Sequence, residues 1–257
     1  MQRRIRLIVA VLALSALASV AFAQFYRRGY APAVDQPLVG EPKEWTFARL
    51  AYDGNGFRGG SGWAVDYPRA EEHFSQAVDR LTRIDVHPDG HVISPNSDDL
   101  FNYPWLYAVE VWSWSFSDSQ AERMREYLLR GGFLLCDSFY GTVEWDGFIA
   151  SLQRVFPDRP IVELPDTHPI FHAVYDLTNR PQIPTWQHLP RGGYRNDGAV
   201  AHWRAILDDD ERVMVMITFN NDVADGWQRA DEYDYPQEAA NLAISLGVNF
   251  AVYALSH

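Results

Sequence analysis

Residues 70–81 repeat their apolar side chains at helical spacing. Ala70, Phe74, Val78 and Leu81 lie on one face of a helix formed by this segment, and polar or charged residues hold most other positions. The pattern predicts an amphipathic helix that packs on a core through its apolar face.

Weaker signals predict three more helices. Ser117 and Gln120 match the capping box, in which each side chain bonds the other residue's backbone N–H at a helix start. The glycines at 131–132 are expected to end that helix. Apolar periodicity predicts two further helices, at 148–156 and from about 236 to 255.

Short apolar or aromatic runs between these helices predict strands. The predicted strands are residues 45–53, 105–112, 133–136, 160–164 and 212–219. Several are apolar throughout, which is typical of parallel strands covered on both faces. The alternation of strands and helices predicts an α/β fold, a three-layer α/β/α sandwich around a mostly parallel sheet.

The first 23 residues have the three parts of a secretory signal peptide. Three arginines give a positive start, an apolar run covers residues 7–20, and residues 21–23 form an A-x-A cleavage site. We expect export to the periplasm with cleavage after Ala23, and an uncleaved anchor is the alternative. Because the apolar run is shorter than the about 20 residues that span a bilayer, no stable membrane span is expected after cleavage.

The rest of the chain divides by composition. Residues 24–43 contain Pro and Gly without periodicity and are expected to form an extended leader before a single domain at 44–257. Within that domain, residues 176–204 are rich in Pro, Gly and aromatic residues, which predicts a loop excursion across the surface.

The 257-residue chain carries a formal net charge of −12. So acidic a protein repels nucleic acid and anionic lipid headgroups, and neither is an expected partner. A small molecule or a periplasmic protein is the expected partner instead. The single cysteine allows no internal disulfide, so stability must come from burial of the 47% of residues that are hydrophobic.

In a parallel sheet, ligands bind beyond the C-terminal ends of the strands. Polar residues and glycines follow four of the predicted strands at that position. The ligand-binding residues predicted on this basis are Asp53, Gly54, Asp137, Ser138, His168, Asn220, Asn221, Asp222 and Trp227. Segments far apart in the chain would thus bring carboxylates, amides and an imidazole to one edge of the sheet.

The only cysteine raises the question of a nucleophile. Cys136 still lies within a predicted strand, and free cysteine is among the most buried residue types. The neighbouring carboxylate of Asp137 would raise the thiol pKa, which disfavours the reactive thiolate. We therefore predict a structural Cys136 and assign the turn after the strand to Asp137 or Ser138. A cap for the helix after Gly141 is the alternative role of Asp137.

His168 and His172 lie four residues apart, so on a helix both would face one side, as metal ligands often do. Asp166 or Asp137 would complete such a site. The favoured interpretation is structural, with His168 capping a short helix and His172 packed beneath a loop. No cofactor is expected, and a transition metal at the two histidines is the alternative.

Two further motifs have alternative interpretations. Gly54, Gly56 and Gly59 match a dinucleotide fingerprint after a strand, but no helix follows directly, so a flexible or ligand-covering loop at 54–62 is favoured. The segment NNDVADGW, residues 220–227, could bind a cation through its oxygens, although its spacing differs from that of a calcium loop. A structure of Asx-turns is favoured for it.

Several longer motifs carry a family resemblance. They are F-A-R-L-x-Y-D-G, D-L-F-N-Y-P-x-L-Y, R-E-Y-L-L-R-G-G-F-L-L-x-D, V-F-P-D-R-P-I-V-E-L, H-P-I-F-H and G-V-N-x-x-V-Y-A-L-x-H. Spread from Phe47 to His257, this series resembles the domain of unknown function 4159 family. The resemblance implies a flavodoxin-like fold related to class I glutamine amidotransferases, with the same sheet that the periodicity predicts.

The resemblance implies no catalytic residue. Amidotransferases place their cysteine in a G-x-C-x-G elbow, whereas the comparable strand end here reads L-C-D-S-F, so the cysteine comes one residue early and the glycines are absent. Glutaminase activity is therefore not expected. The favoured hypothesis is a noncatalytic exported domain that binds a ligand at the strand ends, where Trp186, Tyr194 and Trp227 could stack on it.

The alternative hypothesis is a hydrolase. Asp137 would act as general base or nucleophile and His168 or His172 as its acid–base partner, with or without a metal. This requires Asp137 and a histidine to lie within hydrogen-bonding reach of each other, directly or through one water.

Overall fold

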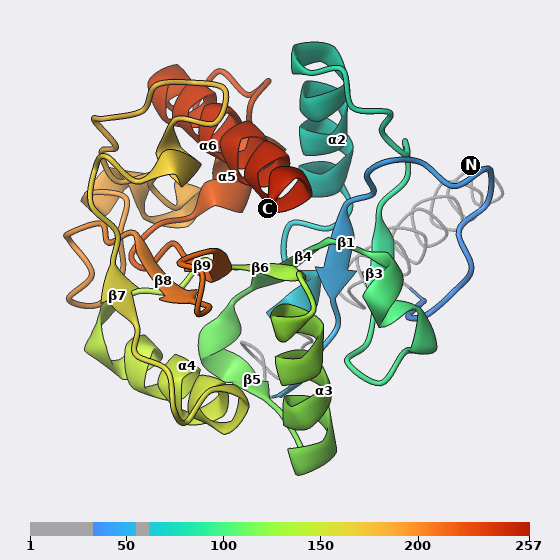
Figure 1. Ribbon diagram of the computed structural model, residues 1–257. Coiled ribbons are helices and arrows are strands. Elements are labelled where there is room, and N and C mark those ends of the chain that lie inside the picture. The colour runs from blue at the N-terminus through green and yellow to red at the C-terminus, as the bar shows by residue number, and fades with distance from the viewer. Residues whose placement is uncertain (1–32, 55–61) are drawn as a thin grey trace, which may run out of the picture. The chain divides into compact units, whose positions relative to one another are not determined.

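The computed structural model describes residues 33–54 and 62–257 (Figure 1), and the counts below refer to that part of the chain. The predicted signal peptide at 1–23 and most of the glycine-rich loop at 54–62 lie outside the described residues.

Most described strands join one sheet, in the order β3-β1-β4-β6-β9-β8-β7. Their bounds are β1 (Ala48–Leu50), β3 (His91–Ile93), β4 (Trp105–Val109), β6 (Phe133–Asp137), β7 (Val162–Glu163), β8 (Arg204–Leu207) and β9 (Val213–Ile217). The first five strands in this order, β3, β1, β4, β6 and β9, are parallel to one another. Strand β8 pairs antiparallel with β9, and β7 pairs antiparallel with β8. Two short strands, β2 (Asp53–Gly54) and β5 (Trp114–Ser115), pair separately.

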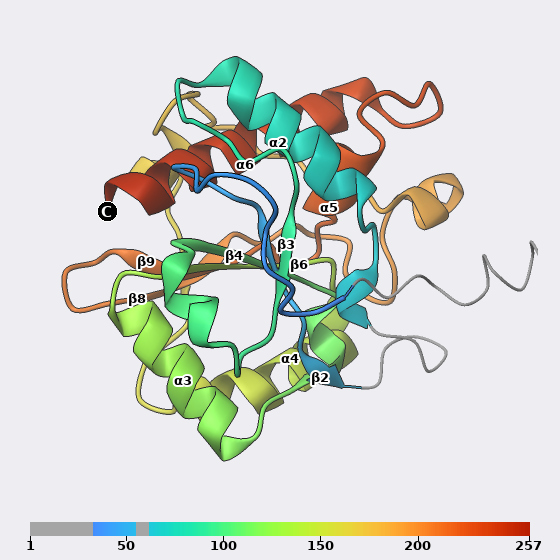
Figure 2. The ribbon, with the colours of Figure 1, turned by 90° about the vertical axis from the view of Figure 1, so that its right-hand side faces the viewer.

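Helices cover both faces of the sheet (Figures 1 and 2). On one face lie α2 (Arg69–Leu81), α5 (Val223–Gln228) and α6 (Gln237–Ser256), and on the other lie α3 (Asp118–Leu129) and α4 (Gly141–Val155). Each face has its own apolar core cluster. When the five parallel strands are numbered 1 to 5 in chain order, their order across the sheet is 2-1-3-4-5. This is the flavodoxin-like strand order. The predicted fold class is confirmed.

The strongest local signals gave correct elements. The predicted helix at 70–81 is α2. The capping box starts α3, with the Ser117 hydroxyl accepting from the Gln120 N–H at 3.2 Å and the Gln120 side chain accepting from the Ser117 N–H at 2.8 Å. Helix α4 begins earlier than its apolar periodicity indicated, at Gly141. The short elements β3, β8 and α5 were not predicted, because each spans too few residues to establish a period.

Two strands end where a residue adopts a left-handed backbone. Glu110, with φ of 53°, ends β4 one residue after Val109, so this strand is shorter than predicted. Ser138, with φ of 58°, ends β6 after Asp137. Asp137 therefore still belongs to the strand, and the turn begins at Ser138. Such conformations are uncommon for residues other than glycine and often occur at functional sites.

Helix α6 is long and apolar because it packs in the core. Among the described residues it is the one helix whose length and hydropathy suit a membrane span. Half of its most apolar window is buried in the protein, and it packs against α2 and α5. Its buried Asn249 accepts hydrogen bonds from the backbone N–H groups of Val174 and Tyr175 at 2.9 and 2.8 Å.

Candidate functional site

Acidic residues gather at the C-terminal edge of the parallel strands. The chain leaves β1 toward α2 on one face of the sheet and leaves β4 toward α3 on the other (Figures 1 and 2), so the strand order reverses between β1 and β4. Ligand sites of open α/β sheets lie at such a switch point. The acidic residues that follow the strands here are Asp66 after β1, Glu110 after β4, and Asp222 and Asp225 after β9.

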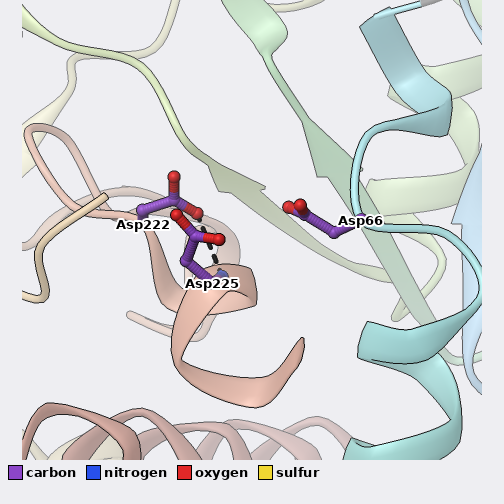
Figure 3. Close-up of side chains that lie close together, drawn as sticks. All are labelled: Asp66, Asp222 and Asp225. Atoms are coloured by element: carbon purple, nitrogen blue, oxygen red, sulfur yellow. Dashed lines mark hydrogen bonds between the residues drawn. The ribbon is translucent and has the colours of Figure 1, made fainter. Parts of the chain in front are cut away.

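Three aspartates from two distant segments form the centre of this edge. Asp66, Asp222 and Asp225 each offer one carboxylate oxygen, and these three oxygens lie within 4.8 Å of one another. Figure 3 shows the Asp66 carboxylate pointing across toward the other two, which come from the start of α5. Asp222 and Asp225 are buried, whereas Asp66 is partly exposed as a residue although its Oδ2 atom is buried. We call these residues the three-aspartate centre.

A buried arginine holds the segment that carries Asp66. Arg49, in the middle of β1, is fully buried and forms an ion pair with the buried Glu71 of α2. Its Nη1 donates to the backbone carbonyls of Trp63 and Val65, each at 2.9 Å. These bonds fix the chain immediately before Asp66, whose backbone is left-handed with φ of 64°.

Hydrogen bonds also fix the other two carboxylates. Asp222 caps α5 by accepting from the Asp225 N–H at 3.1 Å, and its second oxygen accepts from the Ser138 hydroxyl at 3.1 Å. Asp225 accepts from the Thr185 hydroxyl at 3.1 Å and the Trp186 N–H at 2.7 Å. The side chain of Asp222 thus bonds to nearby backbone, which is the kind of local structure predicted for residues 220–227.

Asp137 lies beneath the centre and anchors α5. One of its oxygens accepts from the Thr218 hydroxyl at 2.6 Å and the Val223 N–H at 3.1 Å. The other accepts from the Ala224 N–H at 3.0 Å and the Tyr107 hydroxyl at 3.0 Å. Asp137 therefore caps α5 and not the helix that begins at Gly141, because the Gly141 N–H donates to the side-chain oxygen of Asn220.

Next to the three-aspartate centre, an arginine from the predicted surface excursion at 176–204 forms ion pairs with two glutamates. Arg195 donates to both oxygens of Glu110 at 2.9 Å and forms a second ion pair with Glu144 at the start of α4. It also donates to the Ser138 carbonyl at 3.0 Å. Glu110 and Glu144 thus share the one positive charge of Arg195, and in the centre beside them Asp225 pairs with Arg229.

Burial and mutual repulsion shift the acidity of the centre. Burial, followed by the charge of Asp225, raises the pKa of Asp66 well above its ordinary value, and the charge of Arg49 opposes this increase. The pKa of Asp222 is raised in the same way, by burial and then by the charges of Asp225 and Asp66. Asp137 adds to the repulsion on both residues. Without a counter-charge, the centre therefore retains protons at a pH where free aspartates are ionised.

We expect the metal-free protein to lose stability as the pH rises from about 4 toward neutrality. Between the ordinary pKa of 3.8 and the raised values of Asp66 and Asp222, the native state holds more protons than the unfolded chain, so raising the pH favours unfolding. Each unit of pKa difference is worth about 1.4 kcal/mol. Urea midpoints across this range test the effect.

The variant Asp66→Asn should flatten this pH dependence, since it removes one of the repelling groups. Below about pH 4 stability should fall again as ordinary ion-paired carboxylates gain protons. Asp158 is one of these, because a hydrogen bond from Arg125 lowers its pKa to about 2. A stability that rises steadily up to neutral pH in the wild type would contradict the prediction.

The predicted amides of this edge have structural roles. The Asn220 side chain accepts from the Gly141 N–H at 2.8 Å and donates to the Val200 carbonyl at 2.6 Å. The fully buried Asn221 accepts from the Ile183 N–H at 2.9 Å. Both amides tie the excursion to the sheet edge, so their hydrogen bonds are used within the protein.

Asp53 and Gly54 lie in β2, away from the three aspartates. Asp53 accepts from the Gln120 side chain of α3 at 3.0 Å. A Cβ atom at Gly54 would lie 1.9 Å from the Ser113 carbonyl oxygen, so a glycine is needed for the pairing of β2 with β5. Both residues serve this small sheet in the structure, and neither meets the centre.

The structure does not bring the predicted histidines to Asp137. His168 caps a short turn by accepting from the Ile170 N–H at 3.3 Å, and its ring lies against Tyr253. The Tyr253 hydroxyl accepts from the Val213 N–H at the start of β9, whereas Asp137 bonds Thr218 just past its end. The length of β9 separates these two ends by on the order of 15 Å.

His172 is engaged on both ring nitrogens. Its Nδ1 pairs with Asp176 and its Nε2 with the Asp166 carbonyl, each at 2.7 Å. The side chain of Asp166 pairs in turn with Arg180. The structural interpretation of both histidines therefore agrees with the contacts, and the hydrolase arrangement, which needs a histidine beside Asp137, does not.

Trp227, which the sequence predicts to bind a ligand, lies in the core. Trp227 is fully buried on α5, where its ring stacks on Phe74 of α2 at 4.2 Å between ring centroids. Its indole N–H donates to the Ala243 carbonyl of α6 at 2.9 Å. Trp186 contacts the centre through its backbone N–H, is 37% exposed, and has the Arg229 guanidinium 4.0 Å from its ring.

Cys136 and Ser138 lie where the sequence placed them, and neither is poised as a nucleophile. Cys136 is fully buried in β6, and burial followed by the charge of Asp137 raises the pKa of its thiol. The buried Ser138 hydroxyl is a donor to Asp222 or Glu110, and no described imidazole contacts it. A serine activated by a base would require such a contact.

Asp66 is the site residue that the sequence interpretation missed. It stands alone between Val65 and Tyr67, with no other polar residue beside it to form a motif. Its position did carry a signal, because it lies between the first predicted strand and the helix at 70–81, where the strand-end rule places ligand-binding residues. Asp66 lies beyond the glycine-rich loop, whereas the predicted residues Asp53 and Gly54 stand at the strand end itself.

The fold and the site define a class of protein, a flavodoxin-like α/β sandwich with a buried acidic centre at its strand ends. The chain belongs to the family described as a domain of unknown function (DUF4159), whose model matches residues 46–255. No curated protein matches the chain. The resemblance drawn from the sequence motifs is thereby confirmed, and the relation to amidotransferases stays a prediction.

Proposed function

We propose that this protein is an exported, noncatalytic binding domain whose ligand carries positive charge and binds at the three-aspartate centre. The observation that carries the proposal is the shortage of positively charged partners for three clustered carboxyl groups. Among the described residues, Asp66 and Asp222 form no ion pair, and Asp225 shares its partner Arg229 with Glu232. Buried charges are normally paired or bound to cations, so a positively charged ligand would complete the site.

The absence of a catalytic arrangement in the described chain supports binding over hydrolysis. Asp137 uses both oxygens to accept four hydrogen bonds, and these orient α5. A general base would need a free lone pair directed at a substrate or a water. The signal-peptide pattern at the N-terminus supports export, and the proposed location is the periplasm.

Thermal unfolding of the purified protein with a panel of small molecules tests this proposal. The panel contains organic cations (spermidine, arginine and choline), divalent metal chlorides, and neutral or anionic controls (glucose, alanine and citrate). A cationic ligand at about 100 times its Kd should stabilise the fold by about 2.7 kcal/mol. For a domain of this size that stabilisation corresponds to roughly 5–10 °C in Tm.

Two variants connect the shift to the site. Asp66→Asn should abolish it, while Asp146→Asn, which changes an exposed aspartate of α4 outside the centre, should leave it intact. Stabilisation by the neutral or anionic compounds alone, or a shift unaffected by Asp66→Asn, would count against the proposed site. Amino-terminal sequencing of the periplasmic protein tests export, with Gln24 expected as the first residue.

A further inference from the structure

We infer that the three-aspartate centre binds a divalent cation that prefers oxygen ligands, Mg²⁺ or Ca²⁺. This inference rests on the proposed function and names the ligand class of the same site. Its first support is geometric, since three oxygens that lie within 4.8 Å of one another can contact one ion at the bond lengths of about 2.0–2.6 Å found for these metals.

An unpartnered carboxylate oxygen is the second and independent support. The Oδ2 atom of Asp66 is buried and accepts no hydrogen bond. Buried polar atoms without partners are rare in folded proteins, and each calls for a missing ligand, water or ion. Figure 3 shows that the Asp66 carboxylate points at Asp222 and Asp225, so whatever satisfies its oxygen lies between the three side chains.

The carboxylates of Asp222 and Asp225, by contrast, accept several hydrogen bonds from the protein. Asp222 accepts from Ser138 and from the Asp225 N–H, and Asp225 accepts from Thr185 and the Trp186 N–H. These bonds orient two of the carboxylates before any ligand arrives, which is how partners behind a metal site position its ligands. No described residue donates to the Oδ2 atom of Asp66, which approaches from the opposite segment to complete the group.

The donor set selects the kind of cation. The three side chains supply only carboxylate oxygens, and neither a histidine nor a cysteine belongs to the group. Mg²⁺ and Ca²⁺ bind such oxygen ligands and fill their remaining positions with water or carbonyl groups, whereas structural zinc sites use cysteine and histidine.

Protons are the competing occupants of the centre. A proton shared between two of the carboxylates would also relieve their repulsion. The two occupants differ in what they predict, because protonation requires no metal and a bound cation is displaced by a chelator.

Calorimetric titration of the chelator-treated protein with MgCl₂ and with CaCl₂ separates these outcomes. One ion is expected to bind per chain. Asp66→Asn should weaken its binding at least about tenfold, because changing even a residue that only supports a metal ligand costs about 10–100-fold in affinity. Asp146→Asn should bind as the wild type does. Terbium luminescence, sensitised by nearby tyrosine and tryptophan rings, gives a second readout of the same site.

The fold of Asp66→Asn is checked by its urea midpoint without metal. Its buried Oδ2 atom accepts no hydrogen bond in the wild type, so the variant should be at least as stable as the wild type at neutral pH. Binding of neither metal, or equal binding by Asp66→Asn, would overturn the inference. If an organic cation still binds in an Asp66-dependent way, the proposed function stands without it. If no cation of either kind binds, both fail.

Discussion

Replacing Arg49 with methionine is expected to lower the free energy of unfolding by about 3–5 kcal/mol, the cost of breaking a buried ion pair from one side. The variant leaves Glu71, which is 2% exposed, as a buried charge without its partner. It also removes the donors to the carbonyls of Trp63 and Val65. The segment that carries Asp66 would therefore lose its attachment to β1.

Chemical denaturation of Arg49→Met measures this loss. The double variant Arg49→Met, Glu71→Leu should recover much of it, because apolar residues of similar volume often replace a buried ion pair with little cost. Single-variant losses below about 1 kcal/mol would mean that water reaches the pair and screens it. We further expect Arg49→Met to weaken cation binding, since Asp66 is positioned through these contacts.

Replacing Trp227 with alanine is expected to destabilise the fold by about 3–5 kcal/mol, the range for large aromatic residues in a core. The indole is fully buried, stacks on Phe74 and donates to the Ala243 carbonyl, so it links α5 to both α2 and α6. Its loss would leave a cavity where these three helices meet. Thermal or urea unfolding measures the effect.

Two matched variants give this prediction its controls. Trp227→Phe keeps an aromatic ring for Phe74 but loses the hydrogen bond, so a smaller loss of about 1–3 kcal/mol is expected. Trp186→Ala removes a tryptophan that is 37% exposed and should change stability by less than about 1 kcal/mol. If Trp227→Ala unfolds like the wild type but loses ligand binding, Trp227 would be a binding residue after all.

Trp227 shows how the tertiary structure can place a residue differently from what its neighbours in the sequence indicate. In NNDVADGW it follows four polar side chains and a glycine, a composition typical of a loop, so it was assigned to the ligand. The segment in fact contains the six-residue helix α5, too short to show helical periodicity. Its burial comes from α2 and α6, which lie far from it in the chain.

Asp137 shows the same limit at a polar residue. The sequence placed it correctly at the end of a strand, and there its role depends on donors that the chain supplies only after folding. Thr218, Val223 and Ala224 provide three of its four hydrogen bonds from more than 80 positions away. With the Tyr107 hydroxyl, these donors occupy both oxygens of the Asp137 carboxylate, for which the sequence suggested the role of base or nucleophile.

The sequence by itself determined the elements whose information is local: the periodicity of α2, the capping box of α3, and the apolar strands that require a covered, parallel sheet. It also predicted which edge of that sheet gathers polar residues, because strand direction follows from the alternation of strands and helices. Only the tertiary structure decided which of those residues form the centre. Asp66 meets Asp222 and Asp225 through the packing of α2 on α5, and contacts between segments so far apart leave no pattern in either segment alone.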